Sequence, residues 1–279
     1  MIMERKDGKI SAESVLRRME RTMSGAAQGK DRQRQAQDLV YDAWEAADTD
    51  DMFNLLQEAV ELDPVNVDAW LGLMDFEKLG ENERIEMLRK LVAMGEKNLG
   101  KKVFNEDKGH FWGLLETRPY MRARSQFALR LMEAGRHEES IAEHEAMLEL
   151  NPNDNQGVRY GLMSLYLAVK RLDGARRLFH QYGEQKFSTV WAWGYVLERL
   201  LSEDTPGAAK ALQAARKQNP HAQAYFLEHR KLPKTMPGSY SPGSQEEAII
   251  AWDILRIAWK KHPDAQSWLK SQKGKKEEV

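Results

Sequence analysis

Apolar residues recur along most of the chain with helical spacing, and no stretch shows the sustained two-residue alternation of a half-buried strand. Asp, Asn or Pro stands where helices are predicted to begin, and glycine stands where they end. Gly135, for example, closes one predicted helix, and Asn-Asp-Asn at 153–155 opens another. The pattern therefore predicts an all-α fold with essentially no sheet.

A fixed spacing organises the middle of the chain. Pro152 and Pro220 lie 68 residues apart, which is twice 34, and each follows an asparagine. A period of 34 residues resembles the tetratricopeptide repeat, a pair of antiparallel helices. Three frames at 121–154, 155–188 and 189–222 place a small residue at the position where the family's helices approach closely: Ser140, Gly174 and Ala208. Residues 121–222 are therefore expected to form three such repeats.

The flanking segments are assigned by the same reasoning. Residues 36–98 contain two degenerate helical repeats, the second opening at Trp70 and Leu73. Residues 99–120 form an insertion with its own apolar group around Phe111 and Trp112, expected to be an extra packing helix or a lid. We expect residues 1–35 to be a mobile N-terminal segment and residues 272–279 a disordered tail.

Residues 223–271 are expected to form C-terminal capping helices. Ser244 with Glu247 three residues later has the spacing of a capping box. The helix that follows, towards Trp259, carries too many apolar residues for an exposed surface. Stacked helical hairpins build a right-handed superhelical solenoid with one concave groove, and terminal units must cover its end. We therefore predict a tetratricopeptide-type solenoid closed by a C-terminal capping helix.

A second resemblance covers roughly residues 110–260. Asn-Pro-His at 219–221 with Tyr225 and Leu227, the proline-rich turn 232–242, and Gly-Ser-Gln-Glu-Glu-Ala at 243–248 resemble the C-terminal part of the suppressor-of-tumorigenicity family and related uncharacterised bacterial proteins. Segments 116–123 and 151–157 resemble those bacterial proteins as well. This resemblance implies an all-helical repeat protein with no assigned enzymatic activity. Membrane-spanning segments of the eukaryotic members have no counterpart here.

Composition narrows the function classes. The chain has 42 basic and 43 acidic side chains, a formal net charge of −1 and no cysteine. Disulfides, thiol nucleophiles and cysteine-ligated metals are excluded, and the overall charge provides no field for gripping nucleic acid. The N-terminus lacks the apolar core of a secretory signal, and the longest apolar run, 160–169, is too short to cross a membrane. We expect a cytoplasmic protein that binds no membrane.

Candidate catalytic and metal-binding groups do not assemble into a site in the sequence. His137 and His144 are seven residues apart rather than four, and Ile141 stands where a zinc-binding helix needs histidine, so a solvated helix face is the better interpretation. His110 shows no nucleophile or partner carboxylate that would complete a catalytic set, so a packed or interfacial histidine is the better interpretation. No phosphate-binding glycine motif occurs. We therefore expect no enzymatic activity, cofactor or metal, with an enzyme or enzyme subunit whose site lies near 99–120 as the alternative.

The inner helices of tetratricopeptide repeats line the groove with fixed positions. In this chain those positions mix arginine, glutamine, methionine and aromatic residues, which suit a peptide ligand. The predicted partner-binding groove contains Arg122, Gln126, Gln156, Arg159, Tyr160, Met163 and Trp193. The alternative is that several of these side chains pack on a neighbouring helix. Leu129, Met163 and Leu197 stand where chaperone-type members carry a carboxylate-clamp asparagine, which argues against a chaperone-tail clamp.

Charge is segregated along the chain. Residues 36–68 hold ten acidic residues and no Lys or Arg, whereas residues 206–234 hold six basic and one acidic. Ordinary surface variation is one explanation, and a partner or a second copy stacked head to tail that matches sign with sign is the other. RNA binding by the basic C-terminal half is a further alternative. The preferred hypothesis is an intracellular protein-interaction scaffold that binds a peptide or helix of an unidentified partner.

Overall fold

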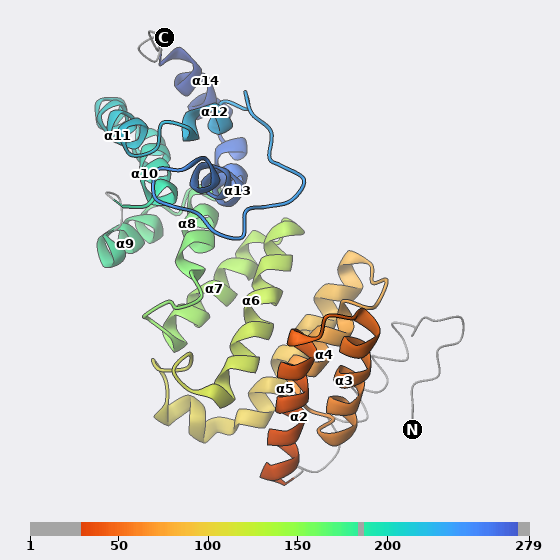
Figure 1. The fold of residues 1–279 in the computed structure, drawn as a ribbon. Coiled ribbons are helices and arrows are strands. Elements are labelled where there is room, and N and C mark those ends of the chain that lie inside the picture. The colour runs from red at the N-terminus through yellow and green to blue at the C-terminus, as the bar shows by residue number, and fades with distance from the viewer. Residues whose placement is uncertain (1–28, 184–186, 273–279) are drawn as a thin grey trace. The chain divides into compact units, whose positions relative to one another are not determined.

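The computed structural model describes residues 29–183 and 187–272 of the chain, and within these ranges the regular structure is helical throughout (Figure 1). The all-α prediction is confirmed. The chain divides into two compact units, the first ending at Asn155 and the second beginning at Gln156. Most of the predicted mobile segment 1–35 and of the predicted tail 272–279 lies outside the described residues. Within the described part, the first helix already begins at Lys30, ahead of the expected boundary at residue 36.

Unit 1 is a series of consecutive helical hairpins. Its helices are α2 (Lys30–Glu45), α3 (Thr49–Leu62), α4 (Val67–Met74), α5 (Glu81–Glu106), the short 3-10 helix η1 (Leu115–Thr117), α6 (Arg118–Glu133) and α7 (His137–Leu150). Each helix packs on the next one, and the first helices of successive hairpins also meet, α2 on α4 and α4 on α6. This contact pattern defines a repeat architecture in which α2, α4 and α6 share one side.

Local sequence sets these helix boundaries. The Asp48 carboxylate accepts hydrogen bonds from the backbone N–H groups of Asp50 and Asp51 at the start of α3. The Asn66 side chain accepts one from the Ala69 N–H, at 2.9 Å, and so starts α4. Apolar residues one helical turn apart then face inward, as Ala36, Val40 and Ala43 do on α2. Burial of these stripes against Leu56, Trp70 and Leu88 forms the core of unit 1.

The segment predicted as an insertion, 99–120, is packed against its neighbours. Gly100 has a positive φ of 70° and kinks α5, whereas Gly95 lies inside the helix. Phe111 is buried with its ring centroid 5.0 Å from that of Phe104. The backbone N–H groups of Gly109 and Phe111 donate to the Leu150 carbonyl at the end of α7. The segment therefore covers a helix terminus, which fits the packing alternative rather than the lid.

Unit 2 contains two further hairpins and a C-terminal helical group. The hairpins are α8 (Val158–Ala168) with α9 (Leu172–Tyr182) and α10 (Thr189–Leu201) with α11 (Thr205–Gln218), followed by α12 (Ala222–Phe226), α13 (Gln245–Lys261) and α14 (Pro263–Ser271). Helix α8 begins at Val158 instead of following Asn-Asp-Asn at 153–155, because Asp154 (φ 48°) and Gly157 (φ 71°) both turn the backbone into the left-handed region before the helix can start.

The turns within three hairpins repeat the same backbone geometry. Gly135, Lys170 and Glu203 follow the first helix of their hairpins, and all three have positive φ values of 73°, 58° and 61°. After each of them the next N–H donates to the carbonyl five residues earlier, as from Arg136 to Leu131. This is the Schellman ending of a helix, which satisfies carbonyls left free in its last turn. The repeated turn supports the predicted period where the side chains themselves differ.

Helix α13 packs on both α8 and α10, the first helices of the two hairpins in unit 2 (Figure 1). Ser244 caps it as predicted, accepting from the Glu247 N–H at 3.2 Å. The Glu247 carboxylate, buried, does not fold back as in a simple capping box but accepts from the Thr189 and Gly243 N–H groups. This glutamate therefore fixes the start of α10 and the start of α13 to each other.

Candidate functional site

The most exposed aromatic surface of unit 1 lies on the side shared by α2, α4 and α6, here called the α2–α4–α6 face. Trp44 on α2 is 46% exposed although it is among the largest apolar side chains of the protein. The Arg122 guanidinium, from α6, lies over its ring at 5.1 Å from the centroid. Asp68 on α4, only 1% exposed, accepts two hydrogen bonds from the same guanidinium, one of them from Nε at 2.8 Å. Arg122 of α6 thus contacts the Trp44 indole, and Asp68 of α4 fixes Arg122 in that position.

Further groups extend this face. Tyr41, 37% exposed, lies one turn before Trp44, with ring centroids 5.4 Å apart. On α6, Gln126 is exposed one turn after Arg122, and Leu129 is exposed one turn later still. Gln37 donates from its side-chain amide to Asp68, which completes the support of Arg122. The face therefore offers aromatic, apolar and hydrogen-bonding groups on a framework fixed by buried polar contacts, which is the composition of a protein-binding surface.

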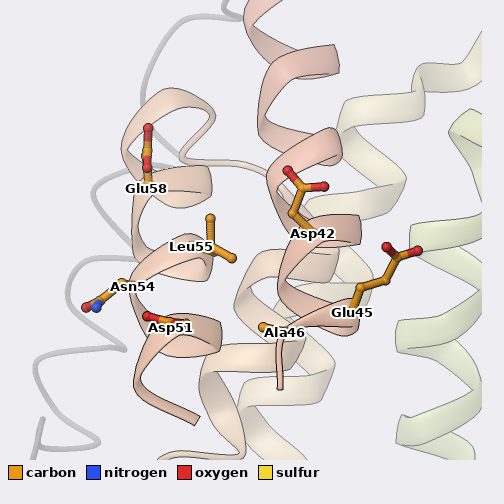
Figure 2. Close-up of a pocket in the computed structure, with 7 residues that line it drawn as sticks. All are labelled: Asp42, Glu45, Ala46, Asp51, Asn54, Leu55 and Glu58. Carbon is orange, nitrogen blue, oxygen red and sulfur yellow. The ribbon is translucent and has the colours of Figure 1, made fainter. Parts of the chain in front are cut away.

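A shallow pocket of about 430 Å³ lies between α2 and α3, next in sequence to the aromatic pair (Figure 2). Leu55 points from α3 into the space between the two helices, and Ala46 lies at the end of α2. The remaining lining residues are all polar: Asp42, Glu45, Asp51, Asn54 and Glu58. The pocket thus combines a small apolar floor with four carboxylates.

The predicted groove residues fall into two groups. Arg122 and Gln126 belong to the α2–α4–α6 face, as described above. In unit 2, Met163 and Trp193 have no exposed surface at all. Trp193 stacks on Phe226 of α12 with ring centroids 4.2 Å apart and contacts Trp259 of α13. These two predicted contact residues are therefore part of the core, the alternative that the sequence left open.

The chain's own C-terminal helices cover this side of unit 2. Ser164, one position after Met163, donates its hydroxyl to the Ile254 carbonyl of α13 at 2.7 Å. His262, immediately after α13, contacts the Leu167 carbonyl through Nε2 at 2.8 Å. The surface of α8 and α10 that was predicted to face a partner is thus covered by α12 and α13. The predicted cap packs along two repeats rather than on the last one alone.

The other predicted residues of unit 2 lie at its beginning. Gln156 and Arg159 are half-buried. The Arg159 guanidinium lies over the rings of Tyr160 and Tyr182, at 4.3 and 5.2 Å from their centroids, and donates to the Tyr160 hydroxyl. Tyr160 in turn packs edge-on against Trp191. This aromatic and arginine cluster keeps part of its surface exposed, so Gln156, Arg159 and Tyr160 stay predicted contacts.

The titratable groups singled out from the sequence do not form a reaction centre. His110 is exposed, with its backbone N–H bonded to Asp107. His144 is buried, and its Nδ1 lies 2.8 Å from the Ser140 carbonyl, so the expectation that it sits on a solvated face is wrong. Burial lowers its pKa, because the charged imidazolium would lose its hydration. Among the described residues no group of histidine, aspartate and glutamate has the arrangement of a metal site.

Sequence reasoning missed three residues of the α2–α4–α6 face: Tyr41, Trp44 and Asp68. Tyr41 and Trp44 are three residues apart, and Ala36, Val40 and Ala43 already supply a complete apolar stripe to α2. A helix with its core stripe filled by small residues has no interior place for two large aromatic side chains. That excess was a signal available in the sequence. The pairing of Asp68 with Arg122, 54 residues away, was not.

The fold and the face together define a class: an all-helical protein of consecutive hairpins that presents an aromatic and arginine-bearing surface from the first helices of its N-terminal hairpins. Residues 131–192 match the sequence model of the tetratricopeptide repeat family. This match covers the second helix of the first predicted repeat, the whole of the second repeat and the first residues of the third, and it supports the tetratricopeptide repeat type over these residues. In the part of the chain that the structure describes, no helix is long and apolar enough to span a bilayer.

Among solved structures, the chain is similar to YrrB, described as a TPR protein with an unusual peptide-binding site. The two sequences are 18% identical, the similarity covers 74% of this chain and 93% of that chain, and the TM-score is 0.40. A search of curated proteins finds no match. None of these comparisons bears on the likeness to the suppressor-of-tumorigenicity family, which stays a prediction.

Proposed function

We propose that this protein is an interaction scaffold that binds a peptide or helix of a partner protein on the α2–α4–α6 face. The observation that carries the proposal is Trp44, a half-exposed indole held by Arg122 and, through it, by the buried Asp68. Tryptophan and arginine dominate the energy of protein interfaces when they are prearranged, because little conformational entropy is then lost on binding. The tetratricopeptide match at 131–192 supports a scaffold more broadly.

The side of α8 and α10 that the family would use for binding is occupied by α12 and α13. The proposal therefore assigns the principal contact to unit 1, through Tyr41, Trp44, Arg122, Gln126 and Leu129. Gln156, Arg159 and Tyr160 are proposed as a separate contact surface of unit 2. Neither the enzyme alternative nor the RNA alternative gains a specific observation in the described residues, and both rank below the scaffold.

A peptide library displayed on phage and selected against the purified protein tests this assignment. Peptides selected by the parent protein should bind Trp44→Ala at least about thirtyfold more weakly, since loss of a central tryptophan costs about 2 kcal/mol or more. Tyr240→Ala is the matched control, because Tyr240 is similarly exposed, at 51%, but belongs to unit 2. Equal binding to the parent and to Trp44→Ala would contradict the proposed site, provided that circular dichroism shows both proteins folded.

A further inference from the structure

The charges around the aromatic pair on α2 distinguish this face from the rest of the protein. No lysine or arginine occurs from Gln35 to Glu77, a stretch that contains about two thirds of α2 and all of α3 and α4. The acidic side chains of α2 and α3 in this stretch are exposed: Asp38, Asp42, Glu45, Asp50, Asp51, Glu58 and Glu61. The hairpin that carries Tyr41 and Trp44 thus has only negatively charged side chains from Gln35 onward.

Helical spacing places two of these carboxylates, Asp38 and Glu45, beside the Tyr41 ring. Asp38 lies three residues before Tyr41 and Glu45 lies four residues after it, so both are neighbours of the phenol on the helix surface. Asp42 follows Tyr41 directly, and with Glu45 it also lines the pocket between α2 and α3 (Figure 2). The aromatic surface and the acidic pocket therefore share a border.

The nearest cations do not cancel this field. Arg122 lies on Trp44, but its charge is matched by the bidentate contact with Asp68, so the pair is neutral as a unit. Lys30, Arg32 and Arg34 are exposed at the opposite end of α2, in its first turns. Around Tyr41 and Trp44 the flanking charge on α2 is thus negative, and the Arg122–Asp68 pair adds no net charge beside them.

We propose that the partner of this face is a basic segment, a peptide or helix that carries lysine and arginine side chains together with at least one apolar side chain. This inference rests on the proposed function and specifies its ligand. A cation placed over the exposed part of an indole or phenol ring is attracted by the ring's negative face. The alkyl stem of a second lysine or arginine packs on Leu55 and Ala46 in the pocket, with its charged end among the carboxylates of Asp42, Glu45 and Glu58.

Fluorescence anisotropy with a labelled short peptide of lysine, arginine and leucine tests the inference, with a second peptide in which glutamate replaces every lysine and arginine. The basic peptide should bind and the acidic one should not. Asp38→Asn, Asp42→Asn and Glu45→Gln combined should weaken binding of the basic peptide by about tenfold, because three exposed charges contribute modestly each. Raising the salt concentration should weaken it in the same direction, since salt screens exposed charges.

Glu81→Gln, Glu96→Gln and Glu116→Gln combined provide the matched control. These three side chains are exposed elsewhere in unit 1, and their replacement changes the net charge by the same amount. If the control triple weakens binding as much as the α2 triple, the effect is one of net charge and the inference is overturned. Equal binding of the acidic peptide, or no binding of the basic one, overturns it as well.

The same measurements separate the two proposals. Binding that requires Trp44 but is indifferent to the three α2 carboxylates leaves the proposed function standing and overturns the basic ligand. Binding that requires the carboxylates but is unchanged in Trp44→Ala contradicts the proposed aromatic site. Loss of binding in both variants, with the control triple unchanged, is the result that we expect.

Discussion

The Arg122 guanidinium and the Asp68 carboxylate form a bidentate ion pair in which the acid is almost fully buried and the base is a quarter exposed. This asymmetry has energetic consequences, because the two partners differ in what remains after the other is removed. Without Arg122, a buried carboxylate keeps only the Gln37 amide. Without the Asp68 charge, the arginine can turn towards water.

We therefore expect Arg122→Ala to lower the free energy of unfolding by about 2–4 kcal/mol, and Asp68→Asn by about 1–2 kcal/mol, because an unpaired buried charge is more costly than an exposed one. Urea denaturation followed by circular dichroism measures both. Arg130→Ala is the control, since Arg130 forms a comparable pair with Glu133 on the surface and should cost less than about 1 kcal/mol. The reverse ranking of the Arg122 and Asp68 variants would show that the pair is not desolvated as described.

His144 should make the stability of unit 1 depend on pH below neutrality. Burial lowers the pKa of its imidazole from the ordinary value of 6.5. On acidification, the imidazole of the unfolded chain is therefore protonated at a higher pH than that of the folded chain. The free energy of unfolding is therefore unaffected by this histidine above about pH 6.5, and it decreases as the pH falls below that value, by up to about 1.4 kcal/mol per pH unit. The midpoint of urea unfolding, measured from pH 7.5 to about 5, reports this slope.

His144→Asn should reduce that slope, because the amide can still donate to the Ser140 carbonyl that Nδ1 contacts but does not titrate. The residual slope includes His262, whose pKa is also lowered by burial. His110→Asn, an exposed histidine of the same unit, is the control for the substitution itself. An unchanged slope in His144→Asn would mean that the His144 imidazole does not cause the loss of stability at acidic pH.

Two glycines of unit 2 should respond differently to alanine. A Cβ at Gly174, on α9, would lie 2.9 Å from the Tyr166 ring, which cannot bend away, so Gly174→Ala should lower stability by at least about 1 kcal/mol. A Cβ at Gly194, on α10, would meet the flexible sulfur and terminal methyl of Met163, and the better helix propensity of alanine offsets that contact. Melting temperatures of the two variants rank them, and equal values would refute the close approach at Gly174.

The hairpin turns offer stabilising substitutions. Lys170 and Glu203 have positive φ values at the position that Gly135 occupies in the preceding hairpin. Replacing either by glycine removes the strain of a side chain in the left-handed region, and we expect a gain of about 0.5–1 kcal/mol in each case. Gly135→Ala should lose about 1 kcal/mol for the converse reason. Thermal unfolding measures all three, and a loss of stability in both glycine variants would contradict the assigned backbone geometry.

Sequence periodicity was sufficient for the helical architecture. Gly135 ends its helix, Ser244 caps α13, and Gly174 lies where the repeat needs a small residue, since each of these roles depends on a residue type that acts locally. The positive φ values of Lys170 and Glu203 could not be predicted from the sequence in this way, because neither residue type favours that conformation. Their geometry follows from the packing of the two helices that they connect.

The candidate site was only partly predictable for a different reason. Arg122 and Gln126 were expected on the binding face and lie there, whereas Trp193 is buried under Phe226 and Trp259. Whether an aromatic residue on a repeat helix is exposed depends on which distant segment packs over it, and helical periodicity carries no information on that. Trp44 shows the converse case, an aromatic residue left exposed because smaller side chains already fill the core side of its helix.

The absence of lysine and arginine between Gln35 and Glu77 also has a practical consequence. Trypsin can release this part of the chain only as one 44-residue peptide, Gln35 to Lys78, so the acidic part of the hairpin, from Gln35 onward, appears as a single mass in a digest. Amine-reactive labels and amine coupling to a sensor surface leave the same region chemically untouched. The α2 and α3 part of the proposed binding face therefore stays free of attachment points when the protein is immobilised through its lysines. Chemical labelling of carboxylates, with and without a ligand, would show whether this face is covered.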